Sequence, residues 1–184
     1  MNTSRFTIDN HQIVQARFIA SPNYNSRPED GLIDLVVIHN ISLPAGNFGT
    51  PYIEQLFCNT LDCSIDSSFA DLKGVEVSAH LLIKRDGELV QFVPFDQRAW
   101  HAGVSCFQGR DGCNDFSIGI ELEGDDVTPY TEQQYEVLQD VLISLIQHYQ
   151  IPLNNIVGHC DIAPQRKTDP GPVFQWTRVR QALT

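Results

Sequence analysis

Two short apolar segments, far apart in the chain, each lead directly to a histidine. Residues 32–38 (Leu-Ile-Asp-Leu-Val-Val-Ile) precede His39 and Asn40, and residues 155–158 (Asn-Ile-Val-Gly) precede His159. Runs of this length, rich in aliphatic and β-branched residues, are typical of strands that are covered on both faces. Open sheets present ligands at the carboxyl ends of their strands. We therefore expect both histidines at that edge of a central sheet.

The segment that follows His159 adds further reactive groups. Residues 159–172 read His-Cys-Asp-Ile-Ala-Pro-Gln-Arg-Lys-Thr-Asp-Pro-Gly-Pro. Pro170 biases Asp169 toward extended backbone geometry, and in an extended segment Lys167 and Asp169 project to the same side. A cation and an anion aimed at one place on a proline-stiffened loop indicate a functional site more than a core.

His39, His159 and Asp169 together offer two imidazoles and a carboxylate. This ligand set suits zinc and leaves a fourth position for water. The spacing is not diagnostic, because no local motif places two histidines a few residues apart. Taken singly, each histidine is more readily explained as a satisfied polar group at a strand end. The two strand ends and the Lys-Thr-Asp-Pro loop, taken together, favour the metal site.

Other patterns predict further strands. An Asp-Gly pair between two apolar runs, residues 79–84 and 88–93, is a hairpin signal. Residues 116–122 form another strand pattern, whose alternation puts Glu121 and Glu123 on the face opposite the aliphatic side chains. We expect Glu123, near the end of this strand, to be solvated.

Helix signals surround these strands. Thr131 and Gln134 form a capping box at the start of the clearest helix, which ends before Pro152. Shorter helices are expected over residues 51–58 and 173–183.

The length and composition complete the prediction of the fold. Residues 42–77 are rich in Gly, Ser, Asn and Asp, which is typical of a lid, a binding loop or a disordered segment. The 184 residues are 42% hydrophobic, enough for one domain with a substantial core. We predict an α/β fold over residues 1–184, a single domain with a mixed central β-sheet flanked by α-helices.

Six segments resemble, in order along the chain, the zinc-dependent N-acetylmuramoyl-L-alanine amidases. They are LVVIHNISLP (35–44), VSAH (77–80), KRDG (84–87), RAWHAG (98–103), NDFSIGIELEG (114–124) and the loop 159–172. The wider family includes phage amidase-type lysozymes and peptidoglycan recognition proteins, and in many of these the third metal ligand is a cysteine. Asp169 in its Lys-Thr-Asp-Pro context is similar instead to the cytoplasmic branch that acts on 1,6-anhydro-muropeptides.

The resemblance implies an activity and a catalytic set. The bond cleaved would be the amide between the lactyl group of N-acetylmuramic acid and L-alanine, with zinc held by His39, His159 and Asp169. Glu121 matches the family's catalytic glutamate and would move the proton. Lys167 matches the family's lysine and would stabilise the oxyanion. Without the resemblance, Glu121 reads as a charge on the wet side of an antiparallel sheet, and Lys167 as an ordinary surface lysine.

Substrate recognition would involve residues around the metal. Trp100 is suited to stack on the apolar face of a sugar, although it serves equally well as a core residue. His101 and Asn40 offer hydrogen bonds, and Arg110 could meet a lactyl, peptide or sugar oxygen, unless it is simply exposed. Gly112 stands where this branch is expected to carry a second basic residue. His80 is expected to be structural or to support the site from behind.

Charge, apolar runs and cysteine content limit the binding partners and the cellular compartment that we expect. A formal net charge of -11 argues against binding nucleic acid through bulk electrostatics. Residues 1–28 hold no apolar run long enough for a signal peptide, and no stretch of about 18 apolar residues occurs. We expect a cytoplasmic monomer that binds muropeptides and neither membrane nor nucleic acid. The five cysteines should be reduced thiols.

Two other functions remain open from the sequence. The chain could be a catalytically silent muropeptide-binding module, which an assay of turnover would reveal. It could also be a cysteine hydrolase that uses Cys160 or Cys106, although we interpret Cys160 as a packing residue. Sensitivity to chelators separates a cysteine hydrolase from the zinc enzyme.

Overall fold

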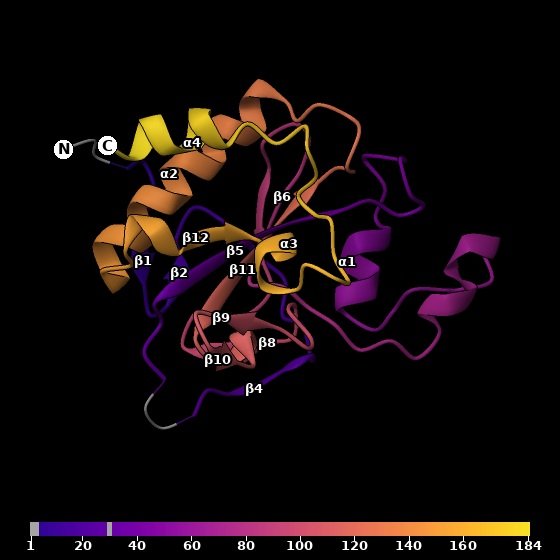
Figure 1. Ribbon diagram of the computed structural model, residues 1–184. Helices are drawn as coiled ribbons and strands as arrows, with labels where there is room; N and C mark the ends of the chain where they lie inside the picture. The colour runs from indigo at the N-terminus through magenta and orange to yellow at the C-terminus, as the bar shows by residue number, and fades with distance from the viewer. Residues whose placement is uncertain (1–3, 29–30) are drawn as a thin grey trace.

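The centre of the molecule is a six-stranded mixed sheet in a computed structural model that describes residues 4–28 and 31–184. The strand order is β12 (Ile156–Gly158), β5 (Leu35–Ile41), β11 (Ser117–Glu123), β6 (Leu81–Ile83), β7 (Leu89–Gln91) and β3 (Arg17–Phe18). Neighbouring strands are parallel except β6 and β7, which form the predicted antiparallel hairpin. The two longest strands, β5 and β11, lie side by side in the middle of the sheet (Figure 1).

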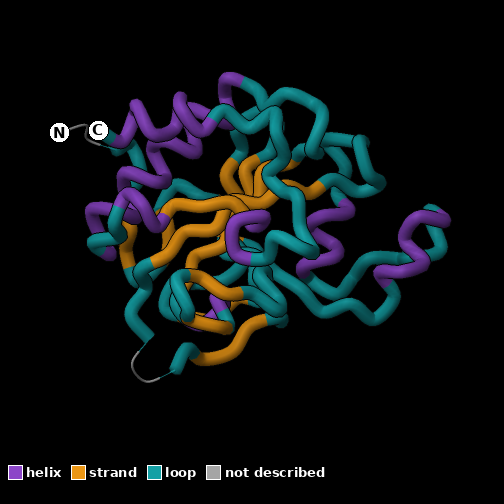
Figure 2. Tube along the Cα trace, viewed as in Figure 1, coloured by secondary structure: helices purple, strands orange, loops and turns teal. Residues whose placement is uncertain are grey.

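Within the described residues, three two-stranded ribbons and four α-helices are found besides this sheet. Figure 2 shows helices and loops packed around the central strands. The ribbons are β1 (Ile8–Asp9) with β2 (Gln12–Ile13), β4 (Tyr24–Ser26) with β8 (Gln97–Ala99), and β9 (Cys106–Phe107) with β10 (Arg110–Asp111). The α-helices are α1 (Tyr52–Phe57), α2 (Glu132–Tyr149), α3 (His159–Ile162) and α4 (Trp176–Leu183). Short 3-10 helices are η1 (Ser67–Leu72), η2 (Cys113–Asp115) and η3 (Leu153–Asn155). The predicted α/β class, with a mixed sheet flanked by helices, is confirmed.

The two faces of the central strands have different partners. On one face, Ile38 and Ile120 pack with Leu138 and Leu142 of α2 in the largest apolar cluster. Side chains alternate along a strand, so the opposite face of the same strands carries His39 and Glu121. The central strands therefore supply apolar packing on one side and the chemistry on the other.

Helix α2 begins where its capping box predicts. Thr131 Oγ1 accepts a hydrogen bond from the backbone N–H of Gln134, and Gln134 Oε1 accepts one from the N–H of Thr131. The rings of Tyr130 and Tyr135 meet edge to face at 6.2 Å and form the hydrophobic staple. The helix ends at Tyr149, before Pro152.

Several boundaries differ from the sequence prediction, and α4 begins at Trp176 instead of residue 173. Strand β5 continues through His39 to Ile41, because the parallel pairing with β11 extends to that residue. His39 therefore lies within the strand instead of after it, while His159 opens the short helix α3. The irregular segment at residues 42–77 contains the predicted helix α1, whose Ile53 packs on the second face of the sheet.

None of the helices in the described part of the chain has the length and apolarity needed to cross a membrane.

Gln134 links the cap of α2 to the sheet. Its Nε2 donates to the carbonyl oxygens of Ile83 and Glu123, at 3.2 and 2.9 Å, and its side chain is buried. Gln134→Ala should lower the free energy of unfolding by roughly 2–4 kcal/mol, since it removes part of the cap and leaves two buried carbonyl groups without their donor. Urea denaturation measures the change. The exposed neighbour provides a control, since Gln133→Ala should stay within about 0.5 kcal/mol of the parent; equal effects would contradict this role.

Candidate metal centre and active site

Three of the predicted residues converge on one point. His39 Nδ1 lies 2.9 Å from His159 Nδ1 and 3.1 Å from Asp169 Oδ2, and the distance between His159 Nδ1 and Asp169 Oδ2 is 3.0 Å. All three side chains are buried, and they form the group of potential metal ligands found in the described residues.

The sheet and the loop after α3 bring these residues together. Strand β12 pairs in parallel with β5, with Gly158 opposite Ile38, so the residues that follow each of them become neighbours. The loop then folds back, and the backbone N–H of Cys160 donates to the carbonyl oxygen of Asp169. Tyr130 holds the same turn, because its hydroxyl donates to the carbonyl oxygen of Pro170 at 2.7 Å.

The far nitrogen of each imidazole also has a partner. His159 Nε2 lies 3.2 Å from the carbonyl oxygen of Ala102, which can only accept, so this nitrogen carries the proton and Nδ1 keeps its lone pair. His39 Nε2 lies 2.9 Å from His101 Nδ1. Both imidazoles therefore face the convergence point with Nδ1.

The electrostatics favour the protonation states that bind metals. Burial lowers the pKa of His39 to about 4, outweighing the hydrogen bond with Asp169, so the ring is neutral at pH 7. Burial also opposes ionisation of Asp169, but hydrogen bonds with His159 and His39 outweigh it and lower the pKa of this carboxyl. Neutral imidazole and ionised carboxylate are the forms in which these groups act as ligands.

The three donor atoms fit a zinc ion. Ligands about 2.0–2.1 Å from zinc at tetrahedral angles lie roughly 3.3 Å from one another, close to the separations of 2.9–3.1 Å found here. Two nitrogens and one oxygen match the chemistry of zinc ligands and leave a fourth position open, as in catalytic sites.

Glu121 stands beside this cluster. It is opposite His39 in the parallel pairing of β11 with β5, and it is 8% exposed. Its Oε2 is buried and has no hydrogen-bond partner among the described residues. Burial, followed by the charge of Asp169, raises the pKa of Glu121 well above its ordinary value, against the opposing effect of Lys167. A buried acid with an unpaired oxygen is suited to exchange protons with a ligand or water.

Glu123 differs from Glu121 although both lie on the same face of β11. It is 1% exposed, so the predicted solvated role is wrong. Its two oxygens accept hydrogen bonds from the backbone N–H groups of Gly49 and Arg85, at 2.5 and 3.0 Å. These bonds satisfy the buried carboxylate and tie two loops to the sheet.

Lys167 follows a turn at residues 164–166, and Asp169 opens the next turn, at residues 169–170; the two residues 167 and 168 belong to no helix or strand. The backbone N–H of Lys167 bonds to the carbonyl oxygen of Ala163 and so curls the chain. The two side chains nevertheless share one cleft of about 730 Å³, whose wall also includes Asn40. Burial sets the direction of the pKa shift of His39 and of Glu121, and the charge of Lys167 makes a smaller, lowering contribution to each.

Asp126 belongs to this cleft, although none of the sequence patterns above points to it. Its Oδ1 accepts from Asn40 Nδ2 at 2.9 Å and its Oδ2 from Thr168 Oγ1 at 2.5 Å. It thereby connects β5 to the turn that carries Lys167 and Asp169. Its position just after the end of β11, at the carboxyl edge of the sheet, is the signal that could have identified it.

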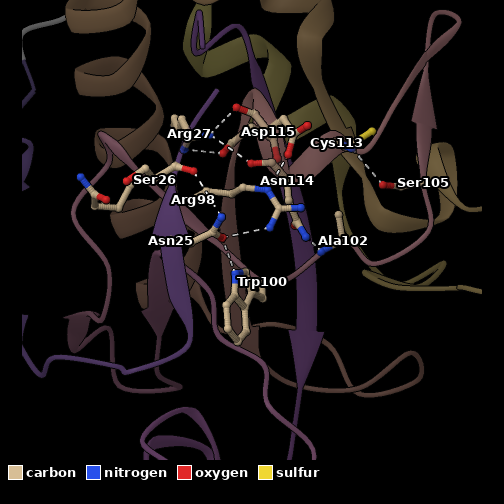
Figure 3. Close-up of polar contacts among 12 residues, drawn as sticks. Asn25, Ser26, Arg27, Arg98, Trp100, Ala102, Ser105, Cys113, Asn114 and Asp115 are labelled. Carbon is tan, nitrogen blue, oxygen red and sulfur yellow. Dashed lines mark hydrogen bonds and ion pairs between the residues drawn. The ribbon is translucent and has the colours of Figure 1, made fainter. Parts of the chain in front are cut away.

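The remaining predicted substrate residues occupy different places. Trp100 is half-buried, and its indole N–H donates to Asn25 Oδ1 at 2.7 Å, which fixes the ring (Figure 3). His101 packs against His39 instead of lining the cleft.

Arg110 is not brought to the metal ligands. It pairs with Asp34 at 2.6 Å, and its guanidinium stacks on Phe116. Both partners come just before the central strands, at the end of the sheet opposite the cluster. Gly112 has a positive φ of 71°, a conformation that favours glycine over the basic residue expected there.

Neither cysteine considered as a nucleophile is activated. A hydrogen bond with Asp111 raises the pKa of Cys106, and burial, followed by Asp161, raises that of Cys160. Nucleophilic cysteines need the opposite shift.

Comparisons with known proteins identify relatives of this site and fold. Residues 28–172 match the family described as N-acetylmuramoyl-L-alanine amidase. The chain is 56% identical over 177 residues to the 1,6-anhydro-N-acetylmuramyl-L-alanine amidase AmpD of Enterobacter cloacae, covering 96% of this chain and 95% of the relative. It is 57% identical over 168 residues to AmpD of Escherichia coli strain K12, covering 91% and 92% of the two chains.

Solved structures of amidases are similar to this chain as well. A crystal structure of an AmpD selenomethionine derivative superposes with a TM-score of 0.94 and 54% identity, covering 97% of this chain and 99% of the other. The amidase AmiD of Escherichia coli, in complex with anhydro-N-acetylmuramic acid-L-Ala-D-gamma-Glu-L-Lys, superposes with a TM-score of 0.62 and 30% identity, covering 96% and 65%.

One zinc ion per chain is expected at the His39, His159 and Asp169 cluster. Zinc should raise the melting temperature, because a ligand that binds only the folded state stabilises it. Replacing any of the three by Ala should abolish this shift, and the zinc bound after dialysis should fall to background by elemental analysis. His148→Ala, which removes an exposed imidazole from the end of α2, should behave like the parent chain. Full zinc binding by the triple Ala variant would contradict the assignment.

Proposed function

This chain belongs to the N-acetylmuramoyl-L-alanine amidase family, and we propose that it is a zinc enzyme that recycles cell-wall fragments. The reaction is hydrolysis of the amide between the lactyl group of 1,6-anhydro-N-acetylmuramic acid and L-alanine of a muropeptide. The observation that carries the proposal is the convergence of His39, His159 and Asp169 beside the unpaired, buried Glu121 Oε2.

The names of the relatives support this choice of substrate. The AmpD relatives of the chain carry the 1,6-anhydro-N-acetylmuramyl-L-alanine amidase name, and AmiD holds an anhydro-muropeptide in its crystal structure. A formal net charge of -11 disfavours adsorption to an anionic wall polymer. We infer a cytoplasmic enzyme that acts on soluble fragments. The expectation of a monomer stays a prediction.

The metal site would supply the electrophile. A bound zinc ion polarises a carbonyl group and lowers the pKa of water. The two imidazoles are held by Ala102 and His101, and Asp169 by its turn, so the three ligands need no rearrangement to act. Such preorganisation is the main way in which proteins stabilise charge in a transition state.

Glu121 would act as the general base and then as the general acid. Its free oxygen can take the proton of the attacking water and later deliver it to the departing amine of L-alanine. The raised pKa serves this exchange, because a carboxyl that is too acidic would hold the proton poorly.

Lys167 would stabilise the oxyanion. As the amide carbonyl becomes tetrahedral, its oxygen gains negative charge, and an ammonium in the same cleft offsets that charge. Asn40, in the wall of the cleft, would bind the substrate, and Trp100, with its indole fixed by Asn25, would present a flat apolar face to the sugar.

A catalytically silent binding module is the second candidate, and the state of Glu121 disfavours it. A module that only binds has no need for a buried, unpaired carboxylate with a raised pKa beside its ligands. A cysteine hydrolase is disfavoured by the raised pKa of Cys106 and Cys160.

Glu121→Ala should separate catalysis from metal binding. The variant should keep its zinc and its melting temperature and lose about 10²–10⁴-fold in kcat, the usual share of a positioned acid–base group. Glu123→Gln is the comparison on the same strand. In this variant the free energy of unfolding should fall more than kcat does. The reason is that the amide satisfies the N–H groups of Gly49 and Arg85 less well. A larger loss of kcat in folded Glu123→Gln would show that the wrong carboxylate has been assigned.

Lys167→Ala should lower kcat by about 10²–10³-fold and leave KM and zinc content nearly unchanged, the signature of a contact made in the transition state. Lys167→Arg should restore only part of the rate. The exposed Lys73→Ala is a control for the loss of one positive charge. If Lys167→Ala weakens zinc binding and turns over normally at saturating zinc, Lys167 only tunes Asp169.

The substrate class can be tested with two preparations. Purified 1,6-anhydro-muropeptide should release its peptide much faster than insoluble sacculi, as followed by chromatography of the products. The Glu121→Ala variant gives the background for both. Comparable rates on sacculi would contradict a role confined to soluble fragments, and absence of turnover on both would favour the silent module.

A further inference from the structure

The sequence predicts a substrate contact for His101, but its ring lies against a metal ligand. We propose that His101 is a positioning residue that sets the tautomer of His39 and thereby aims its Nδ1 at the metal. This inference rests on the zinc site proposed above and assigns a role to an imidazole outside the ligand set.

A short chain of polar contacts carries the proposal. His39 Nε2 lies 2.9 Å from His101 Nδ1, and His101 Nε2 lies 3.1 Å from Ser117 Oγ. The two rings meet at 85° with their centroids 5.0 Å apart. The contacts therefore run from the back of a metal ligand through a second imidazole to a fully buried hydroxyl.

The direction of these bonds follows from the ligand role. An imidazole that binds a metal through Nδ1 carries its proton on Nε2, and this buried N–H needs an acceptor. His101 Nδ1 is placed to accept it, which leaves the proton of His101 on its own Nε2. Ser117 Oγ is in turn placed to accept that proton. With His39 presenting its Nδ1 lone pair to the metal, each N–H of this chain of contacts has an acceptor.

The position of the His101 ring is fixed by its surroundings. A Cβ atom at residue 119 would lie 2.4 Å from the ring, so only glycine leaves the space that the ring fills. The His80 ring packs against it at 5.7 Å. His80 is itself held by Gly119, whose backbone N–H donates to its Nδ1 at 3.0 Å. His101 therefore cannot easily turn its Nδ1 away from His39.

The dipeptide 101–102 orients both imidazole ligands. His101 meets the far nitrogen of His39, and the carbonyl oxygen of Ala102 meets the far nitrogen of His159. One side chain anchors this dipeptide, because Asn114 Oδ1 accepts the backbone N–H of both residues, at 3.1 and 2.8 Å. Figure 3 shows Asn114 beside Ala102. Partners of this kind typically change metal affinity or activity by 10–100-fold when they are lost.

Zinc affinity of His101 variants, measured by competition with a chromogenic chelator, tests the proposal. His101→Ala should bind zinc about 10–100-fold more weakly than the parent. His101→Asn should recover part of this loss, because its Oδ1 can still accept the His39 Nε2–H. Ser117→Ala, one step further away, should lose less than His101→Ala. His148→Ala controls for the removal of an imidazole elsewhere.

Two further readouts distinguish positioning from structure and from substrate contact. In the zinc-loaded parent, ¹⁵N NMR of the imidazoles should show His39 and His101 both protonated at Nε2. This measurement needs no variant and holds even if His101→Ala fails to fold. At saturating zinc, His101→Ala should keep the parent KM, since the residue does not contact substrate.

Failure of the metal site and failure of the positioning role of His101 give different results. If the parent binds no zinc, the metal site is wrong. If the parent binds zinc and His101→Ala binds it equally well, or if His101 carries its proton on Nδ1, the positioning role is overturned. A raised KM with unchanged zinc affinity would return His101 to the substrate site.

Discussion

The parallel pairing of β5 with both of its neighbours is the constraint on which the site depends. Register places Glu121 opposite His39 on one side, and Gly158 opposite Ile38 on the other, so that His159 follows at the same level. A slip of one residue in β5 would turn His39 into the apolar layer under α2, and the same slip in β11 would turn Glu121 there. The packing of Ile38 and Ile120 against that helix therefore fixes the chemistry on the other face.

A cluster of polar groups buried in a sheet is stable only if almost every atom has a partner. Here the supports come from elsewhere in the chain: Ala102 for His159, His101 for His39, and Asp126 for Asn40 and Thr168. These partners lie on loops at the edge of the site. The hydrogen bonds that orient the ligands also attach these loops to the site.

The sequence predicts the helices and strands better than the contacts around the site. The strands β5 and β12, the hairpin and the capped helix α2 follow from periodicity and local signals, because those signals act within a few residues. The places of His101, Arg110 and Glu123 depend on contacts between distant segments, such as Arg110 with Asp34. Periodicity carries no information about such contacts. The resemblance to a family supplies roles for residues but not the geometry of their partners.

The two glutamates of β11 illustrate what distinguishes a reactive group from a structural one. They have the same side chain, the same face of one strand and similar burial. Glu123 accepts a backbone N–H bond at each of its two oxygens, so both oxygens already have a partner within the protein. Glu121 receives no bond at Oε2 and lies near the carboxylate of Asp169, so its charge is costly and its proton is exchangeable. A carboxylate is therefore available for catalysis when it lacks hydrogen-bond partners within the protein, and its position in the strand matters less.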